Sequence, residues 1–106
     1  MLTQKAAIEK VRRFANAIGG LGVPLTRVVL FGSYSKNTQN KWSDIDVALV
    51  SDKFSGIGFF DSDLIGGIKI QKPFSIIQTR TYNTNDFTPD KDPFVKEILK
   101  TGIEIV

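Results

Sequence analysis

Two short apolar segments, separated by a polar stretch that opens with Gly-Ser, constrain the fold of this chain more than any other feature. The first segment, LTRVVLF (25–31), is rich in β-branched residues and is followed at once by Gly32-Ser33, so it is predicted to be a buried strand. The second, DIDVALVS (44–51), is predicted to be another strand. The polar residues 34–42 between them suit a short helical turn and a loop. The two strands are therefore expected to pair antiparallel or to flank a small helical turn.

The N-terminal segment, residues 3–18, is predicted to be an amphipathic helix. Thr3 is expected to cap it, and Gly19-Gly20 is expected to end it. Its apolar side chains recur at helical spacing: Ala7, Ile8, Val11, Phe14, Ala15 and Ile18.

The middle of the chain is harder to interpret. Residues 52–72 contain apolar side chains at helical spacing, but Gly66-Gly67 interrupts the helix that this spacing favours. Residues 74–80 (FSIIQTR) are predicted to be a third strand. A loop rich in Thr, Asn and Asp is expected over residues 81–92.

The last segment carries clear helix signals. Asp92 is a helix cap, Pro93 occupies the first helical position, and Gly102 is the stop. The apolar stripe consists of Phe94, Val95, Ile98 and Leu99. Residues 103–106 are then expected to form a short closing strand. This order of elements predicts one domain over residues 1–106, of the α+β (α/β) class, with a small mixed β-sheet flanked by helices.

The composition excludes several kinds of chemistry. The 106 residues include neither cysteine nor histidine, which removes disulfides, thiolate nucleophiles, cysteine or histidine zinc sites and imidazole acid–base catalysis. Catalysis would depend on carboxylates, with a metal ion that prefers oxygen ligands. The net charge of +3, from 14 basic and 11 acidic residues, is compatible with an anionic ligand, but a contribution to solubility alone is the favoured interpretation. Without a dense basic stripe, nucleic-acid binding is not expected.

The chain is expected to be cytoplasmic. No apolar run approaches the ~20 residues that a bilayer crossing needs. The first ten residues carry Glu9 and lack the apolar core of a secretion signal, so a membrane partner is not expected either.

Two aspartates mark the start of the second predicted strand. Side chains two residues apart on a strand point to the same face, so Asp44 and Asp46 should lie side by side, with Ile45 and Val47 on the other face. Adjacent carboxylates repel each other, and a divalent cation relieves that repulsion. Mg²⁺ favours one or two protein carboxylates together with phosphate oxygens and water. An Asp-x-Asp pair alone is otherwise a common feature of edge strands and loops.

Gly32-Ser33 supplies a feature complementary to the aspartates. It leaves a strand and is expected to open a helical turn, where free backbone N–H groups attract anions. Gly32 allows close approach of the backbone, and the Ser33 hydroxyl can donate a hydrogen bond to a phosphate. Alone, a Gly-Ser after a strand is usually only a turn. Beside a metal-binding pair, it indicates phosphoryl or nucleotidyl transfer.

The stretch VVLFGSYSKNTQNKWSDIDVALV (28–50) resembles the signature of the minimal nucleotidyltransferases of the DNA polymerase beta-type superfamily. Residues 86–106 resemble the C-terminal ending of these small proteins. The resemblance implies a nucleotidyltransferase fold, Mg²⁺ at Asp44 and Asp46, and contact of Gly32 and Ser33 with the triphosphate of an NTP, with ATP expected. It also implies an antitoxin-like role beside a HEPN-type partner protein, whose hydroxyl is then a plausible acceptor.

The chain departs from the family pattern at a third carboxylate. The resemblance places this acid on the strand after the motif, as a base or a further metal ligand. Neither face of KPFSIIQTRTY (72–82) carries an acid, and Gln78 aligns with the acidic position. Glutamine can orient a hydroxyl but cannot accept its proton.

Several other polar and aromatic residues near the motif have two interpretations. Lys36, Lys41 and Arg80 either contact phosphate or are simply exposed to solvent. Tyr34 and Trp42 either stack on a ligand or pack in the core, and core packing is favoured.

Two functions follow from these observations. The first is an Mg²⁺-dependent nucleotidyltransferase that moves a nucleoside monophosphate from an NTP to a hydroxyl, with Asp44 and Asp46 as catalytic residues. The alternative is a catalytically impaired module of the same fold that binds and neutralises a partner protein, which the loss of the acid at Gln78 favours.

Overall fold

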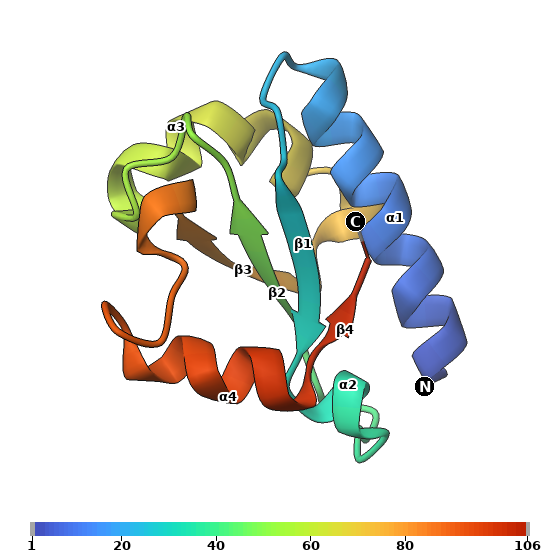
Figure 1. Ribbon diagram of the computed structural model, residues 1–106. Helices are drawn as coiled ribbons and strands as arrows, with labels where there is room; N and C mark the ends of the chain where they lie inside the picture. The colour runs from blue at the N-terminus through green and yellow to red at the C-terminus, as the bar shows by residue number, and fades with distance from the viewer. Residues whose placement is uncertain (1, 106) are drawn as a thin grey trace.

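The computed structural model describes residues 2–105 and is built around a mixed sheet of four strands in the order β3-β2-β1-β4 (Figure 1). The strands are β1 (Arg27–Phe31), β2 (Ile45–Val50), β3 (Ile77–Tyr82) and β4 (Ile103–Glu104). β1 pairs antiparallel with both β2 and β4, whereas β2 and β3 are parallel. The predicted α+β class, with a small mixed sheet and flanking helices, is confirmed.

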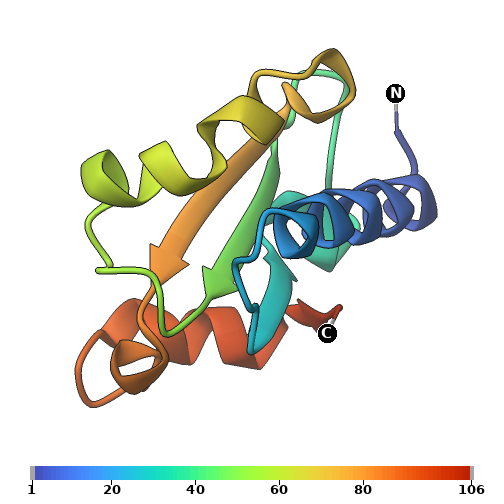
Figure 2. The ribbon, with the colours of Figure 1, turned by 90° about the horizontal axis from the view of Figure 1, so that it is seen from above.

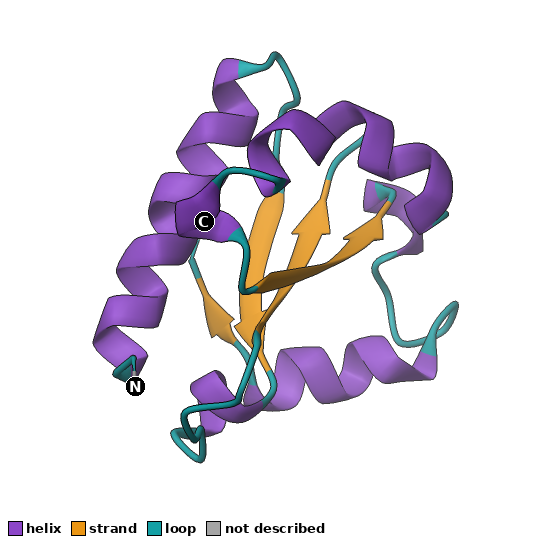
Figure 3. Cartoon of the chain, turned by 180° about the vertical axis from the view of Figure 1, so that it is seen from behind, coloured by secondary structure: helices purple, strands orange, loops and turns teal. Residues whose placement is uncertain are grey.

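The helices lie on both faces of this sheet (Figure 2). They are α1 (Gln4–Gly20), the short α2 (Ser33–Lys36), α3 (Gly58–Lys69) and α4 (Pro93–Thr101), with two 3-10 turns, η1 (Lys72–Phe74) and η2 (Thr84–Asp86). α1 and α3 pack on one face and α4 packs on the other, which Figure 3 shows from behind. Within residues 2–105, no helix has the length and hydropathy that a membrane crossing requires.

The alternation of side chains in β2 creates a hydrophobic cluster on each face of the sheet. Ile45, Val47 and Leu49 face α1 and α3 and belong to the larger cluster, which also contains Phe14 of α1. Ala48 and Val50 point the other way, into a smaller cluster under α4. Both clusters therefore depend on the same central strand.

The expected end of the first helix was wrong. α1 continues through Gly19-Gly20, and the chain turns at Gly22, which has a positive φ of 85°. Only that glycine has the left-handed conformation that ends a helix. Thr3 caps the helix as predicted, because its side chain accepts a hydrogen bond from Ala6 N at 3.0 Å.

The pair Gly66-Gly67 also lies inside a helix, in contrast to the interruption expected there. α3 runs through both residues, since packing of Ile65 into the larger cluster outweighs the low helix propensity of glycine. The third strand begins at Ile77, not at residue 74. Phe74 belongs to η1 instead, where its ring packs 5.3 Å from that of Phe14.

The signals of the last segment were accurate. The Asp92 side chain accepts a hydrogen bond from Phe94 N at 3.0 Å, Pro93 opens α4, and Gly102 follows its end. Of the predicted apolar stripe, Val95 and Ile98 are buried. The closing strand is confirmed over Ile103–Glu104, and residue 106 lies outside the described residues.

Candidate functional site

The pairing of β1 with β2 brings the two halves of the sequence motif together. Phe31, the last residue of β1, lies opposite Asp46 near the start of β2. Gly32 follows Phe31 and forms the N-cap of α2, which begins at Ser33. The Gly-Ser turn and the aspartates therefore lie at the same end of the sheet, and the two expectations for these strands hold together: they pair antiparallel and also flank a helical turn.

Gly32 lies directly against the Asp46 side chain. Its backbone has φ 76° and ψ −152°, a conformation that only glycine adopts readily. A Cβ atom added at Gly32 would overlap Asp46 Oδ2. Glycine is therefore required here both for the backbone conformation and for the space that the carboxylate occupies.

The two carboxylates differ in their surroundings. Asp46 is half-buried within β2, whereas Asp44 is exposed, one residue before the strand begins. Burial, and then the negative charge of Asp44, raise the pKa of Asp46 above its usual value. Within residues 2–105, neither carboxylate accepts a hydrogen bond or forms an ion pair. Both remain available to a cation.

Gln78 lies beside Asp46 on the neighbouring strand. The parallel register of β2 and β3 pairs these two residues, so they point to the same face of the sheet. Arg80 and Tyr82 follow on that face. No group of three or more His, Cys, Asp or Glu side chains that could hold a metal ion occurs among the residues that the structure describes. The site thus has two adjacent carboxylates with the amide of Gln78 beside Asp46.

Asp61 serves a different purpose. It is buried and accepts hydrogen bonds from Ser55 N, Ser55 Oγ, Gly56 N and Thr81 Oγ at 2.7–2.9 Å. Burial opposes its ionisation, but these hydrogen bonds outweigh that effect and lower the pKa of Asp61. Thr81 alternates with Tyr82 along β3, so Asp61 lies on the opposite face of the sheet from Asp46. It is therefore no substitute for the missing acid.

A hollow of about 200 Å³ lies between the Gly-Ser turn and α4. Asp46 and Lys36 line it from one side and Glu97 of α4 from the other; the remaining lining residues are Phe31, Gly32, Phe94, Ile98 and Thr101. The sequence analysis did not identify Glu97 or any other residue of α4 as part of the site. No local signal could have done so, because α4 is separated from the motif by more than forty residues.

Arg80 is engaged by its own neighbours. Its Nε donates to Tyr82 Oη at 2.8 Å, and its guanidinium lies 4.6 Å from the centre of the Phe94 ring. Tyr82 Oη in turn donates to Asp92 Oδ2 at 3.1 Å. These contacts join the end of β3 to the start of α4 on the same face as Gln78.

The aromatic residues at the two ends of the polar stretch have opposite environments. Tyr34 is buried, with 2% of its surface exposed, as predicted. Trp42 is 81% exposed, so its predicted place in the core was wrong. The reason is local: Trp42 lies in a turn outside the sheet.

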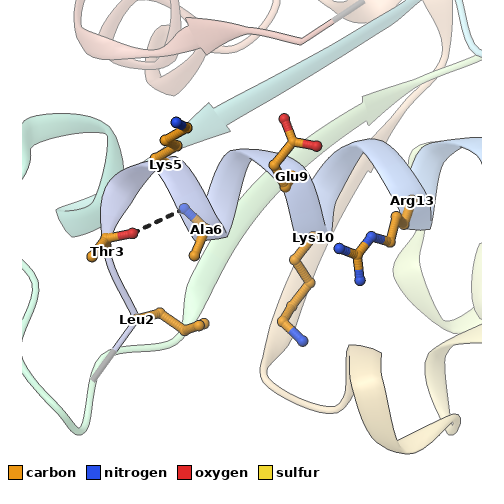
Figure 4. A pocket seen from close by; sticks show the side chains of 7 residues that line it. All are labelled: Leu2, Thr3, Lys5, Ala6, Glu9, Lys10 and Arg13. Carbon is orange, nitrogen blue, oxygen red and sulfur yellow. Dashed lines mark hydrogen bonds between the residues drawn. The ribbon is translucent and has the colours of Figure 1, made fainter.

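A larger hollow, of about 440 Å³, lies elsewhere (Figure 4). Its lining side chains all come from α1 and the two residues before it: Leu2, Thr3, Lys5, Ala6, Glu9, Lys10 and Arg13. It contains none of the motif residues. The candidate site is therefore chosen by the chemistry of its side chains and not by the volume of the hollow.

Comparisons with known proteins identify the family of the chain and a structure of the same fold. A family model described as "Nucleotidyltransferase domain" matches residues 8–103. A search of curated proteins found no match. Among solved structures, the chain is similar to a crystal structure at 1.40 Å resolution of a "putative nucleotidyltransferase" from Sulfolobus solfataricus. The TM-score is 0.64 at 14% sequence identity, and the match covers 95% of this chain and 80% of the other. That likeness shows a shared fold.

Proposed function

This chain belongs to the nucleotidyltransferase domain family, and on that premise we propose that it transfers a nucleoside monophosphate from an NTP, with ATP as the expected donor, to a hydroxyl. Asp44 and Asp46 are the proposed metal-binding and catalytic residues. Gly32 and Ser33 are the proposed contacts for the triphosphate. The acceptor that we propose is a hydroxyl of a partner protein.

One observation carries this proposal. The opposition of Phe31 and Asp46 brings Gly32 against the Asp46 carboxylate, which lies near the charge of Asp44. Within residues 2–105, neither carboxylate has a hydrogen-bond or ion-pair partner. Keeping Asp46 half-buried beside Asp44 is unfavourable, as its raised pKa indicates. A bound cation and an incoming polyphosphate would remove that penalty.

The donor set fits Mg²⁺. Two aspartate carboxylates without competing hydrogen bonds are the ligands that Mg²⁺ prefers when phosphate oxygens and water complete its coordination. When bound, the metal ion would neutralise charge on the transferring phosphate and on the departing pyrophosphate. Asp44 and Asp46 would hold it.

The other residues of the site are proposed to bind the phosphates and to orient the acceptor hydroxyl. Within residues 2–105, the N–H groups of Ser33 and Tyr34 at the start of α2 have no hydrogen-bond partner, so they can donate to phosphate oxygens together with the Ser33 hydroxyl. Lys36 lines the same hollow as Asp46 and can offset phosphate charge. Gln78 can orient the acceptor hydroxyl through a hydrogen bond but cannot take its proton. The acceptor proton therefore passes to solvent or to a group of the acceptor.

The second candidate function is a binding module that has lost turnover. The position of Gln78 beside Asp46 favours it, because an amide stands where a base or metal ligand is expected. In this case the chain binds and neutralises a partner protein with or without bound nucleotide. The resemblance to minimal nucleotidyltransferases makes a HEPN-type protein in an antitoxin–toxin pair the proposed partner for both functions.

Incubation with α-labelled ATP, Mg²⁺ and the product of the neighbouring gene tests the proposal. We expect label on the partner, and its loss by at least 100-fold in Asp44→Asn, because the metal ligand is removed while the shape is kept. Asp63→Asn is the matched control, since Asp63 is an exposed aspartate of α3. Partner binding that persists in the absence of any labelling would favour the module instead. If the protein bound neither MgATP nor the partner, both functions would be wrong.

A further inference from the structure

Trp42 is exposed in the turn that leads to Asp44 and β2. It is the single tryptophan of the chain, and 81% of its surface is accessible. Lys41 lies over its ring, with Nζ 5.0 Å from the ring centre. Tryptophan side chains are highly buried on average, and tryptophan is enriched at interfaces.

The backbone that carries Trp42 is held in a defined turn. Trp42 N donates to Asn40 Oδ1 at 2.8 Å, Asn40 N donates to Ser43 Oγ at 3.0 Å, and Ser43 N donates to Asn40 O at 3.1 Å. These three bonds close residues 40–43 on themselves. The exposure of Trp42 is therefore a property of an ordered turn, and the side chain is presented to solvent by it.

This turn is directly connected to the metal-binding pair. Trp42 precedes Asp44 by two residues, so their Cα atoms are at most about 7 Å apart. The indole can therefore reach the surroundings of Asp44 from outside the sheet. In the proposed binding mode, an NTP extends from its phosphates, at the Gly-Ser turn and the aspartates, to its base at the other end of the molecule.

We propose that Trp42 stacks on the base of the bound nucleotide, while Lys41 adds positive charge beside it. This inference rests on the proposed function and names how its substrate is recognised. Aromatic side chains stack on all bases, because every base presents a π face. The pair is thus expected to bind nucleoside triphosphates as a class, with a modest preference for the larger purines.

Fluorescence of this single tryptophan provides the test. Titration of MgATP into the protein should quench the emission, with the same midpoint as heat release in calorimetry. Magnesium tripolyphosphate carries the phosphates without a base, and it should bind without comparable quenching. Trp42→Ala should weaken MgATP binding about tenfold and leave tripolyphosphate binding unchanged. Trp42→Phe should restore most of the affinity, and Phe59→Ala, which removes an exposed aromatic residue of α3, should have no effect.

The outcomes separate this inference from the proposed function. If MgATP binds in an Asp44-dependent manner but neither quenches the emission nor responds to Trp42→Ala, the stacking role is wrong and the proposed function stands. Equal quenching by tripolyphosphate would also overturn it, as would quenching by the partner protein and not by MgATP. Absence of MgATP binding in calorimetry would remove the proposed function, and this inference with it.

Discussion

The ionised carboxylate of Asp46 lowers the stability of the folded protein. Its carboxylate is half-buried, lies beside Asp44 and contacts Gly32, and no described group compensates its charge. Because burial and the Asp44 charge raise its pKa, the unfolded state loses this proton more readily than the folded state does. Ionisation of Asp46 therefore destabilises the metal-free fold.

We expect Asp46→Asn to stabilise the metal-free protein by about 0.5–2 kcal/mol at pH 7 while abolishing Mg²⁺-dependent nucleotide binding. The gain should vanish below the unfolded-state pKa of aspartate, where Asp46 is protonated in both states, and be complete above its raised folded-state pKa. Thermal unfolding of both proteins at pH 3 and pH 7, without metal, measures this. An equal or lower stability of the variant at pH 7 would contradict it.

At the scale of residues, the sequence predicted which residues belong to the candidate site better than it predicted which side chains are buried. Gly32 and the two aspartates could be selected because a Gly-Ser turn and an Asp-x-Asp pair occur together between two predicted strands. Tyr34 and Trp42, in contrast, look alike in sequence, yet one is buried and the other exposed. Which of them meets apolar surface depends on α1 and on the turn at Asn40, and neither relation is visible in the local pattern.

At the scale of elements, Asp61 connects α3 to the sheet. Its carboxylate binds the loop before α3, through Ser55 and Gly56, and β3, through Thr81. These contacts fix the crossover between β2 and β3. The pairing of Gln78 with Asp46 depends on that crossover, because it aligns β3 with β2.

We expect Asp61→Asn to lower the free energy of unfolding by about 2–4 kcal/mol at pH 7, because an amide would place its own donors against backbone N–H groups. Although burial opposes ionisation, hydrogen bonding lowers the pKa of Asp61. The stabilisation is therefore present above the unfolded-state pKa and is lost as the pH falls through the lower folded-state pKa. Urea unfolding at pH 7 and pH 3 should show a smaller deficit in acid.

Asp63→Asn, which changes an exposed aspartate two residues away, should leave the stability within about 0.5 kcal/mol of the wild type. A deficit of the same size in both variants would show that Asp61 has no special role.

Elements were predictable where local signals dominate. Thr3, Asp92 and Pro93 mark helix starts through hydrogen bonds and backbone restraints that act within a few residues. Glycine pairs were misleading, because a cost of about 1 kcal/mol per glycine is small beside the packing of a neighbour such as Ile65. The register of β2 and β3 could not be predicted from a local pattern either, because it depends on the crossover through α3.

At the scale of the whole molecule, the two hydrophobic clusters share the central strands. β1 and β2 supply alternate side chains to both, and α4 contributes Val95 and Ile98 to the smaller one. Disruption of either cluster would therefore also disturb the strands that support the other. The protein should therefore unfold in one cooperative step.

We expect Ile98→Ala to cost about 2–4 kcal/mol and to keep a single urea transition that far-UV circular dichroism and near-UV aromatic signals report at the same midpoint. Leu99→Ala is the matched control, because Leu99 is 39% exposed and should cost less than about 1 kcal/mol. An early transition confined to α4 would show instead that this helix unfolds independently.

The global arrangement is where sequence reasoning reached its limit. The class of fold and one side of the site follow from the motif between residues 28 and 50, which is contiguous. The other side, formed by Phe94, Glu97 and their neighbours, depends on how α4 returns across the sheet.

The return of α4 has a consequence for biosynthesis. The glycine turn and the aspartates leave the ribosome well before residues 93–104, which form the opposite wall of the hollow and the β4 edge. Since chains emerge at roughly 5–20 residues per second, a nascent chain spends seconds with the proposed metal ligands translated and one wall still missing. If the proposed function holds, a nucleotide that arrives during this interval meets an open site, and the second wall forms only after α4 has emerged.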